Sequence, residues 1–539
     1  EILIGLVGSE MCIRDRLGTA ARKLHSGKGN KNMEIGRSRR RTYPLGQGVE
    51  RNKMKHINKI MASGICLFIT WLFILAGAVE AVWGLAQVYG FTASNHSLYA
   101  LTGSFYNPGP YSGFLAMTLP VCLYEWLKRR KEKKTTAYYV ALSVLLLLIC
   151  VLPAGMSRSA WMAGAVSSAY IAYMHYRKEI HAYIRCHPRR TKAGTILLIL
   201  LAGGILAGVY LMKKDSADGR LLMWKVSVHA IAGQPWRGYG WDGVPGAYGQ
   251  AQEDYFSAGN YTETEERVAG SPEYVFNEYL QVAMAWGVPV LLMALLVVGG
   301  SGYAGHRQKE YGLCGALLSL AVFSFSSYPF QFLLFVVALA LLVTGCAIKT
   351  LSSRRPLVCM AGTVFLLLSA GYGCYQVYRW KEVRETASSA WHRKQMFYRS
   401  GAYEQAAEVY AEIYEDMKWN ARYLFEYGHA LHKLHRNEES NVVMKEALKV
   451  SGDPMILNII GKNEQEAGNY AEAEYWLIRS THRLPGRIYP YFLLAKLYAE
   501  PGFYQRQKLE QAARMVMEKE PKVQSTAIRQ MREEIKKLL

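Results

Sequence analysis

Residues 218–256 read DGRLLMWKVSVHAIAGQPWRGYGWDGVPGAYGQAQEDYF, and residues 273–296 read EYVFNEYLQVAMAWGVPVLLMALL. The first segment is polar and rich in aromatic residues, whereas the second begins with polar residues and continues into a run without charge. This order is typical of a loop outside a membrane that leads back into a membrane-spanning helix. We expect the residues before this region to be membrane scaffold, and those after about Tyr378 to form a water-soluble domain.

The 539-residue chain is 51% apolar, and its apolar residues are grouped in runs without charge. With their flanks, these runs reach the roughly 20 residues that a helix needs to cross a bilayer. The sequence predicts nine spans, near residues 63–89, 110–127, 137–153, 158–176, 194–212, 279–299, 312–327, 329–348 and 356–377. The predicted fold class is therefore all-α, a polytopic transmembrane helix bundle over residues 54–378 followed by a soluble domain.

The net charge of +22 is explained by the loops between the predicted spans, and it does not indicate nucleic acid binding. Basic residues gather at 128–134, 176–192, 306–309 and 348–355. Loops of this kind stay in the cytoplasm. The alternate connections, 90–109 and 213–278, then lie on the outer face, and the second has six Lys/Arg against ten Asp/Glu. The pattern predicts an inner N-terminus and an outer C-terminus.

A repeat of 33 to 34 residues organises the predicted soluble domain, residues 379–539. SGAYEQAAEVYAEIY recurs as LHRNEESNVVMKEAL and AGNYAEAEYWLIRS, which places Tyr403, Asn437 and Tyr470 in register. The small residues Gly428, Gly461 and Ala495 are in register as well. This period resembles that of tetratricopeptide repeats, in which pairs of helices stack into a solenoid. MREEIKKLL, at the end of the chain, is the predicted capping helix.

Residues 1–53 are set apart from the predicted fold. EILIGLVGSEMCIRDR resembles translated sequencing-adapter sequence, and the residues that follow are basic and turn-rich without an apolar period. Two interpretations stay open: an artefact of the gene prediction, which we favour, or a basic cytoplasmic arm. Under the first, Met54 is the native start.

Two arginines have the chemistry to bind a phosphate, because the planar guanidinium pairs with phosphate oxygens in a forked geometry. Arg158 lies in MSRSAWMAG, at the outer end of the fourth span, and Arg220 lies in DGRLLMWK. Trp224, four residues after Arg220, shares its helix face, and it is predicted to contact the substrate or else only to shield the guanidinium. The alternatives are that Arg158 extends to the membrane interface and that Arg220 forms a salt bridge with Asp215 or Asp218.

The motif FNEYLQ contributes further candidates. Glu278 is either a general base, if partial burial raises its pKa, or an acidic group favoured at a helix start. Asn277 and Gln281 share one helix face, where they position a sugar or phosphate or else form a hydrogen bond between helices. Arg237, before the GYGW turn, is a third cation or a solvated charge. The main interpretation of Asn107 is that it forms part of a turn, and the second is that it contacts the lipid carrier.

Three other residues carry weaker expectations. Glu80 lies deep in the first span, where an acid is either functional or paired. His96 and His229, in the outer loops, are surface or packing residues that could serve as a base.

The nine cysteines form no metal or redox pattern, and the acidic residues of the outer loop lack the spacing of a calcium loop, so no metal or cofactor is expected.

The GR-x-x-x-W helix, the G-x-G-W turn and the N-E-Y-L-Q helix entry resemble the O-antigen ligase superfamily, over roughly residues 71–344. The S-R-x-A-W sequence around Arg158 and the T-G-x-F-x-N-P sequence before the second span are similar to the family as well. The resemblance implies a bacterial membrane glycosyltransferase that acts without a metal and moves a glycan from an undecaprenyl-pyrophosphate carrier to an acceptor. It also implies about a dozen spans, so we expect the amino-terminal few to be missing, either because this is a short-form relative or because the gene prediction is truncated.

One position departs from the family. Many ligases have a histidine, taken as the base, immediately before the asparagine of this motif, and this chain has Phe276 there. Phenylalanine does not titrate, so the role cannot be transferred, and Glu278 is the nearest replacement.

The resulting prediction is an inverting glycosyltransferase of the cytoplasmic membrane, with its repeats outside the membrane or in the periplasm. Arg158, Arg220 and Glu278 are the predicted catalytic residues. The acceptor is lipid A core or another glycan, lipid or protein, and the repeats bind it or a protein partner. Three alternatives stay open: an O-antigen polymerase, a protein O-oligosaccharyltransferase, and a catalytically degenerate membrane-anchored scaffold.

Overall fold

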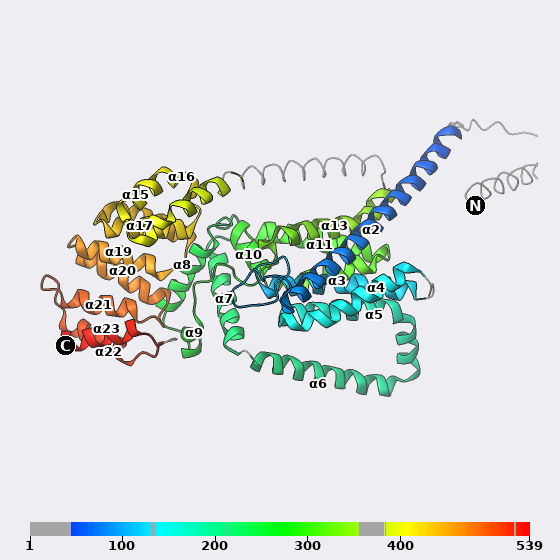
Figure 1. The fold of residues 1–539 in the computed structure, drawn as a ribbon. Helices are drawn as coiled ribbons and strands as arrows, with labels where there is room; N and C mark the ends of the chain where they lie inside the picture. The colour runs from blue at the N-terminus through cyan, green and yellow to red at the C-terminus, as the bar shows by residue number, and fades with distance from the viewer. Residues whose placement is uncertain (1–44, 131–134, 213, 355–381, 383, 522–523) are drawn as a thin grey trace, which may run out of the picture. The chain divides into compact units, whose positions relative to one another are not determined.

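The computed structural model describes residues 45–130, 135–212, 214–354, 382, 384–521 and 524–539, and these residues contain helices and no strand. The chain divides into two compact units, Glu1–Lys53 and Met54–Leu539. Apart from 45–53, where α2 begins, the predicted leader lies outside the described residues. The ninth predicted span, 356–377, lies outside them as well. The all-helical fold class is confirmed (Figure 1).

Eight long or apolar helices cover the predicted spans. They are α2 (Leu45–Val88), α3 (Pro108–Arg129), α4 (Thr136–Val151), α5 (Arg158–Cys186), α6 (Pro188–Met212), α11 (Val288–Arg307), α12 (Tyr311–Ser324) and α13 (Leu333–Arg354). Among the described residues, four stretches are long and apolar enough to cross a membrane: Ile60–Val88, Thr136–Gly155, Val288–Arg307 and Leu333–Thr350. The full count of nine spans stays a prediction.

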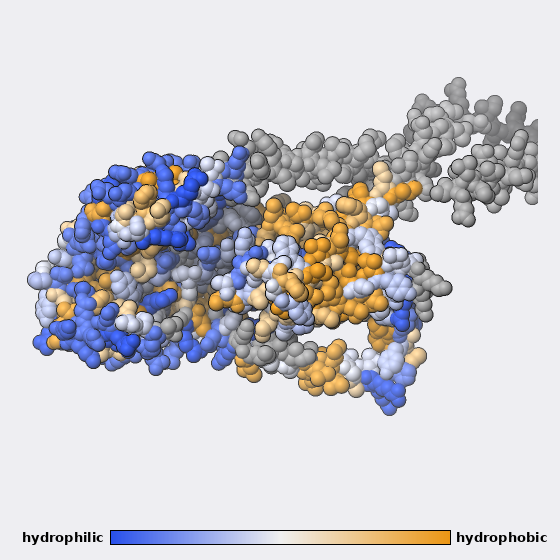
Figure 2. Space-filling view, viewed as in Figure 1, coloured by the Kyte–Doolittle hydropathy of each residue, from blue (hydrophilic) through white to orange (hydrophobic). Residues whose placement is uncertain are grey.

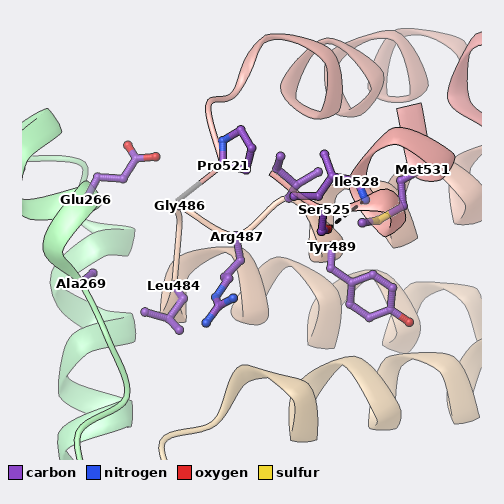
Figure 3. A pocket seen from close by; sticks show the side chains of 11 residues that line it. Glu266, Ala269, Leu484, Gly486, Arg487, Tyr489, Pro521, Ser525, Ile528 and Met531 are labelled. Atoms are coloured by element: carbon purple, nitrogen blue, oxygen red, sulfur yellow. Dashed lines mark hydrogen bonds between the residues drawn. The ribbon is translucent and has the colours of Figure 1, made fainter. Parts of the chain in front are cut away.

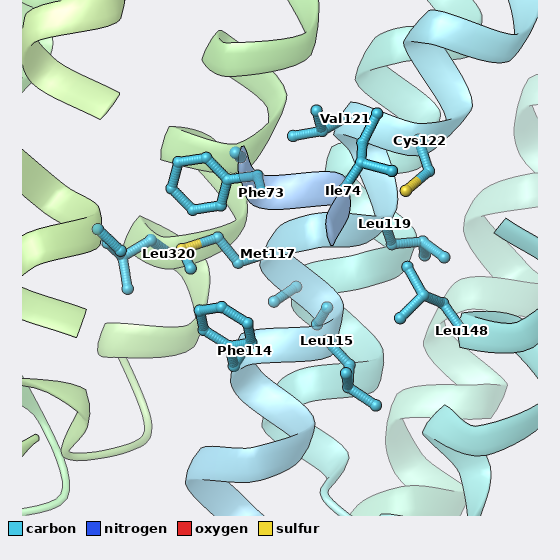
Figure 4. Packing of buried hydrophobic residues seen from close by; sticks show 14 of the residues in the cluster. Phe73, Ile74, Phe114, Leu115, Met117, Leu119, Val121, Cys122, Leu148 and Leu320 are labelled. Atoms are coloured by element: carbon cyan, nitrogen blue, oxygen red, sulfur yellow. The ribbon is translucent and has the colours of Figure 1, made fainter. Parts of the chain in front are cut away.

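The core of this helical region is built around α3. Figure 4 shows Phe114, Leu115 and Met117 of α3 in one apolar cluster with Phe73 of α2 and Leu320 of α12. These side chains are almost completely buried. Other apolar side chains, such as those of α6 and α11, remain exposed, and Figure 2 shows them gathered over this region. Exposed apolar surface of this extent is what a lipid-facing surface requires.

The predicted continuous span 279–299 is wrong, because the helix breaks at Gly287. Helix α10 (Glu278–Trp286) ends there and α11 starts at Val288, with a proline in its first turn. Gly287 has φ of 85°, a left-handed conformation that favours glycine. A Cβ atom at Gly287 would collide with the main-chain carbonyl group of Trp236. Proline cannot donate a hydrogen bond inside a helix, so it suits the first turn of a new one.

The outer loop fills this break. The main-chain N–H groups of Tyr239 and Gly240 donate to the carbonyl oxygens of Met284 and Ala285 at 2.8 and 2.9 Å. The N–H of Val288 donates to the carbonyl oxygen of Pro235 at 2.8 Å. The GYGW turn therefore satisfies the free carbonyl groups at the end of α10, as buried main-chain groups require. The loop itself forms α7 (Lys214–Gly233), α8 (Val244–Ser257) and α9 (Glu263–Val268).

The C-terminal helices follow the predicted period. They are α15 (Tyr403–Glu412), α16 (Tyr414–Met417), α17 (Ala421–Lys433), α18 (Asn437–Val450), α19 (Pro454–Glu466), α20 (Tyr470–Arg483), α21 (Tyr489–Ala499), α22 (Arg506–Glu518) and α23 (Thr526–Leu538). The three residues predicted in register, at 403, 437 and 470, are each the first residue of a helix. Gly428 lies against Met444, and Gly461 lies against Leu477, 33 residues later. Assignment to the tetratricopeptide class stays a prediction.

Candidate functional site

Arg220 lies on α7 and is partly buried without a carboxylate partner. Among the described residues it forms no ion pair, and its Nη1 donates to the main-chain carbonyl oxygen of Ser326 at 3.0 Å. The two acids considered as partners are engaged elsewhere. Asp215 accepts from Arg267 at 2.9 Å, and Asp218 accepts from the hydroxyl of Tyr210 at 2.5 Å. The salt-bridge alternative for Arg220 is therefore wrong, and its charge is left for another anion.

Arg158 is the first residue of α5, and Ser157 caps this helix by accepting from the N–H of Ala160. The neighbouring Ser159 donates to the carbonyl oxygen of Ser326, and the hydroxyl of Ser326 donates back to Ser159 at 2.8 Å. The segment after α12 thus joins the start of α5 to Arg220.

The structure therefore brings the two arginines into one electrostatic site. Burial lowers the pKa of Arg220, and the nearby charge of Arg158 lowers it further. A helix N-terminus carries a partial positive charge of its own, which adds to these two cations at the start of α5. A site of this composition favours an anion.

Aromatic side chains surround Arg220. Its guanidinium lies over the ring of Phe276, 5.4 Å from the centroid. The ring of Phe276 contacts Tyr328 edge to face at 4.9 Å, and Tyr328 stacks on Tyr274 at 5.3 Å. Phe276 has φ of 53°, which is uncommon for a residue other than glycine. Backbone strain of this kind is held in place by its surroundings and often occurs at functional sites.

Glu278, two residues after Phe276, is a buried carboxyl group at the start of α10 with only 2% of its surface exposed. Its Oε1 accepts from the main-chain N–H of Phe330 at 2.7 Å, and its Oε2 has no hydrogen-bond partner within the described part of the chain. Burial raises the pKa of Glu278 to about 7, against the smaller opposing effect of the Phe330 bond. A carboxyl group with this pKa can accept a proton near neutral pH.

A family model described as O-antigen ligase matches residues 142–295, which include Arg158, Arg220 and Glu278. This part of the chain is thus similar to the O-antigen ligase family. The chain is also similar to a general O-oligosaccharyltransferase of Acinetobacter baylyi, with 28% identity over 163 residues. That match covers 28% of this chain and 27% of the relative, so the chain spans about a quarter of the relative's length. No solved structure matches the chain.

The similarity to the O-antigen ligase family, together with the long apolar helices, indicates a membrane protein. Arg158, Arg220 and Glu278 all lie in the part of the chain that matches the ligase family. Arg220 and Ser159, the residue after Arg158, both donate to the carbonyl oxygen of Ser326. The catalytic roles of Arg158, Arg220 and Glu278 are proposals.

The two amides of the ligase motif are both held by the main chain. Oδ1 of Asn277 caps α10 by accepting from the N–H groups of Tyr279 and Leu280 at 3.0 and 3.2 Å. Oε1 of Gln281 accepts from the N–H of Val275 at 3.1 Å. Neither oxygen forms the hydrogen bond between helices that we considered. Asn277 and Gln281 therefore shape the entry to α10, and a role in substrate binding stays a prediction.

The other predicted residues lie apart or have structural partners. Arg237 is exposed in the turn between α7 and α8. Asn107 caps α3 by accepting from the N–H of Gly109 at 3.1 Å. Glu80 accepts from the N–H and hydroxyl of Ser104, so its partner is not a cation. His96 accepts from the N–H of Leu98 through Nδ1.

The remaining predicted residues lie on α7. His229 is exposed on this helix. Trp224 packs edge to face on Phe325 at 5.1 Å, and its indole N–H is buried without a partner in the described residues. The unsatisfied N–H is consistent with the predicted contact to a substrate, since a buried donor favours finding an acceptor.

The segment Phe325–Gln331 was missed by the sequence analysis, which assigned all of it except Tyr328 to two spans. It contains Ser326, Tyr328 and Phe330, and it includes the short 3₁₀ helix η2 (Pro329–Gln331). The signal was the SSYP sequence between two apolar runs, because Ser and Pro are typical of turns.

Proposed function

We propose that this chain is a membrane glycosyltransferase that moves a glycan from an undecaprenyl-pyrophosphate carrier to an acceptor hydroxyl. The observation that carries the proposal is Arg220, a partly buried cation that forms no ion pair within the described part of the chain and lies close to Arg158 at a helix N-terminus. A diphosphate supplies the negative charge that this arrangement favours.

In the proposed reaction, the acceptor oxygen forms a bond to the anomeric carbon of the donor sugar while the bond from that carbon to the diphosphate oxygen breaks. The bonding electron pair leaves with the diphosphate, and the configuration of the sugar inverts. Arg158 and Arg220 stabilise the charge that develops on the leaving group. Oε2 of Glu278, which is buried and unpaired, takes the proton of the acceptor hydroxyl.

The arrangement of the outer loop supports a location of the repeats on the same side of the membrane as the site. Helix α8 of the loop packs on α18 and α20 of the repeats. Combined with the basic loops on the opposite face, this contact supports an extracytoplasmic repeat domain.

Transfer to a protein is the second candidate function, because the Acinetobacter relative is named a general O-oligosaccharyltransferase. The two functions share the donor and the proposed arginine site, and they differ in the acceptor. A degenerate scaffold is less well supported, since it gives no reason for the buried cation and the unpaired carboxyl group.

The test is glycan transfer in cells that express the full chain, its Arg220→Ala variant or its Glu278→Gln variant at equal membrane levels. Arg237→Ala is the matched control, because Arg237 is an exposed arginine of the same loop. We expect the parent and Arg237→Ala to modify lipid A core, a second lipid-linked glycan or protein, and the other two variants to fail. A parent that transfers glycan to none of the three would contradict the proposal in favour of the scaffold.

A further inference from the structure

A large cavity lies between the outer loop and the repeats. Its volume is about 1230 Å³. One wall is formed by the loop and by η2, and the other by the first turns of α17, α19 and α21. A smaller cavity beside it, of about 310 Å³, shares Arg487 and Tyr489 with the large one. Figure 3 shows this smaller cavity, with Glu266 and Ala269 on the loop side and the repeat residues opposite.

Buried ion pairs hold the walls of the large cavity together. Glu253 of α8 accepts from Arg479 at 2.5 Å and from Arg483 at 2.7 Å, and both arginines belong to α20. Gln252 donates to the main-chain carbonyl oxygen of Arg483 at 2.6 Å. Arg483 is only 1% exposed. The loop and the repeats are thus joined by a desolvated contact, so the cavity between them is a fixed feature of the fold.

Two polar groups that line the cavity lack a hydrogen-bond partner. Asn458 of α19 is 1% exposed, and its Oδ1 is unpaired within the described part of the chain. The Nε2 of Gln331, at the end of η2, is buried and unpaired there as well. Buried polar groups are almost always hydrogen-bonded. An acceptor and a donor left open on opposite walls therefore indicate a ligand with both kinds of group.

Aromatic side chains provide the other surfaces. Trp241 and Tyr274 lie on the loop wall, and Trp419 and Phe425 lie on the repeat wall, each of them partly exposed. Partly exposed aromatic rings offer flat apolar faces, which match the C–H faces of pyranose sugars. Rings combined with amide and carboxyl groups suit a ligand whose faces are apolar and whose edges carry hydroxyls.

The charges on the lining nearly cancel. The lining contains three acids, Asp242, Glu273 and Asp453, and two arginines, Arg422 and Arg487. A strongly acidic or basic polymer would meet repulsion from one of these sets, whereas an uncharged chain would not. The composition favours a glycan over a charged polypeptide segment.

Two residues of the cavity lining lie close in the chain to the candidate base or to its hydrogen-bond partner. Gln331 follows Phe330, whose N–H donates to Glu278, and Gln281, which lines the cavity, lies one helical turn after Glu278. An acceptor in the cavity would have its reacting end on the side of Gln281 and Gln331, although Glu278 itself is not part of the lining.

We propose that this cavity is the binding site for an oligosaccharide acceptor, which binds between the outer loop and the repeats. The assignment deepens the proposed function and rests on it. Asn458 and Gln331 bind hydroxyl groups of the glycan, and the rings of Trp241 and Trp419 contact the faces of its sugars.

The experiment measures binding of fluorescently labelled glycans to the full chain in detergent. Three probes are used. The first is the core oligosaccharide released from lipid A by mild acid, the second is the glycan released from the lipid carrier, and the third is a serine- and threonine-rich peptide. The variants are Asn458→Ala and the matched control Asn437→Ala. Asn437 also has a buried, unpaired Oδ1 but lies on α18, and it does not line the cavity.

We expect the core oligosaccharide to bind the parent and Asn437→Ala equally, and to bind Asn458→Ala at least tenfold more weakly with an unchanged melting temperature. Preference for the carrier-derived glycan assigns the cavity to a second lipid-linked chain as acceptor and still supports an oligosaccharide site. Preference for the peptide, equal binding by Asn458→Ala, or no binding by any probe would overturn the proposal.

The Arg220→Ala protein separates this inference from the proposed function. It lacks the proposed diphosphate contact but keeps the cavity, so it should bind the free oligosaccharide as the parent does. Binding by this variant without transfer supports both proposals. Transfer at the parental rate by the same variant would contradict the proposed role of Arg220 in binding the diphosphate, and it would not affect the assignment of the cavity.

Discussion

Arg220 of α7 donates a hydrogen bond of 3.0 Å to the main-chain carbonyl oxygen of Ser326, 106 residues further along the chain. The same carbonyl oxygen accepts from the hydroxyl of Ser159, next to Arg158. This single peptide unit sets the position of Arg220 relative to the first turn of α5. Because a carbonyl oxygen satisfies the guanidinium without neutralising it, the positive charge is retained for an anionic substrate.

Replacement of Arg220 by lysine should reduce glycan transfer by two orders of magnitude or more, although the charge is kept. Lysine is a point charge and cannot bind a carbonyl oxygen and a diphosphate in the forked geometry of arginine. Removal of one stabilising donor typically costs a factor of 10² to 10³ in rate. Transfer in membranes that contain equal amounts of protein is the measurement. The matched change Arg237→Lys should have no effect, and equal losses in both variants would argue against a specific role.

Glycan transfer should rise with pH through about 7. Burial raises the pKa of Glu278 to about 7, so the carboxyl group is protonated below that pH and becomes a base only above it. The measurement is the transfer rate in sealed-membrane preparations between pH 5.5 and 8.5. Glu278→Gln should abolish the rise together with most of the activity. An unchanged pH profile in that variant would place the base elsewhere, with His96 and His229 to be tested next.

Replacement of Glu253 by glutamine should detach the repeats from the outer loop. The change leaves Arg483, which is 1% exposed, without its counter-charge, and breaking a buried ion pair in this way costs about 3–5 kcal/mol. Hydrogen exchange should then increase in α8 and in the facing ends of α18 and α20. Glu439→Gln is the control, since Glu439 forms an exposed pair with Arg436. Unchanged protection in Glu253→Gln would contradict this account of the contact.

The close approach of α8 to the repeats should also be sensitive to a single methyl group. A Cβ atom at Gly246 would collide with the carbonyl oxygen of Lys449, a main-chain atom that cannot rotate away. Gly246→Ala should therefore lower the midpoint of thermal unfolding by several degrees, since overpacking typically costs about 1–3 kcal/mol. Gly270→Ala is the matched control, because no atom lies within 4 Å of the added Cβ there. A larger loss in the control would show that the contact does not limit stability.

Periodicity was sufficient to predict where three of the C-terminal helices begin. Positions 403, 437 and 470, placed in register from the sequence, each begin a helix, because an apolar stripe at helical spacing and the turn residues between helices are local signals. The same kind of signal located the apolar helices. It failed at Gly287, where uniform hydropathy concealed a helix break that Gly and Pro allow and that the GYGW turn completes from 47 residues away.

The sequence by itself determined that the chain is helical, that its first part is apolar enough for a membrane, and that Arg158, Arg220 and Glu278 are candidates for the chemistry. Hydrogen bonds within helices and burial of apolar stripes are set by residues a few positions apart, so these features can be predicted from local patterns. Only the tertiary structure decided that Arg158 and Arg220 share one electrostatic site, that Glu278 is held by Phe330, and that a cavity separates the loop from the repeats. These relationships join residues up to 290 positions apart, as Trp241 and Met531 are in the cavity lining. They depend on which helices pack together, which the spacing of residues along the chain does not specify.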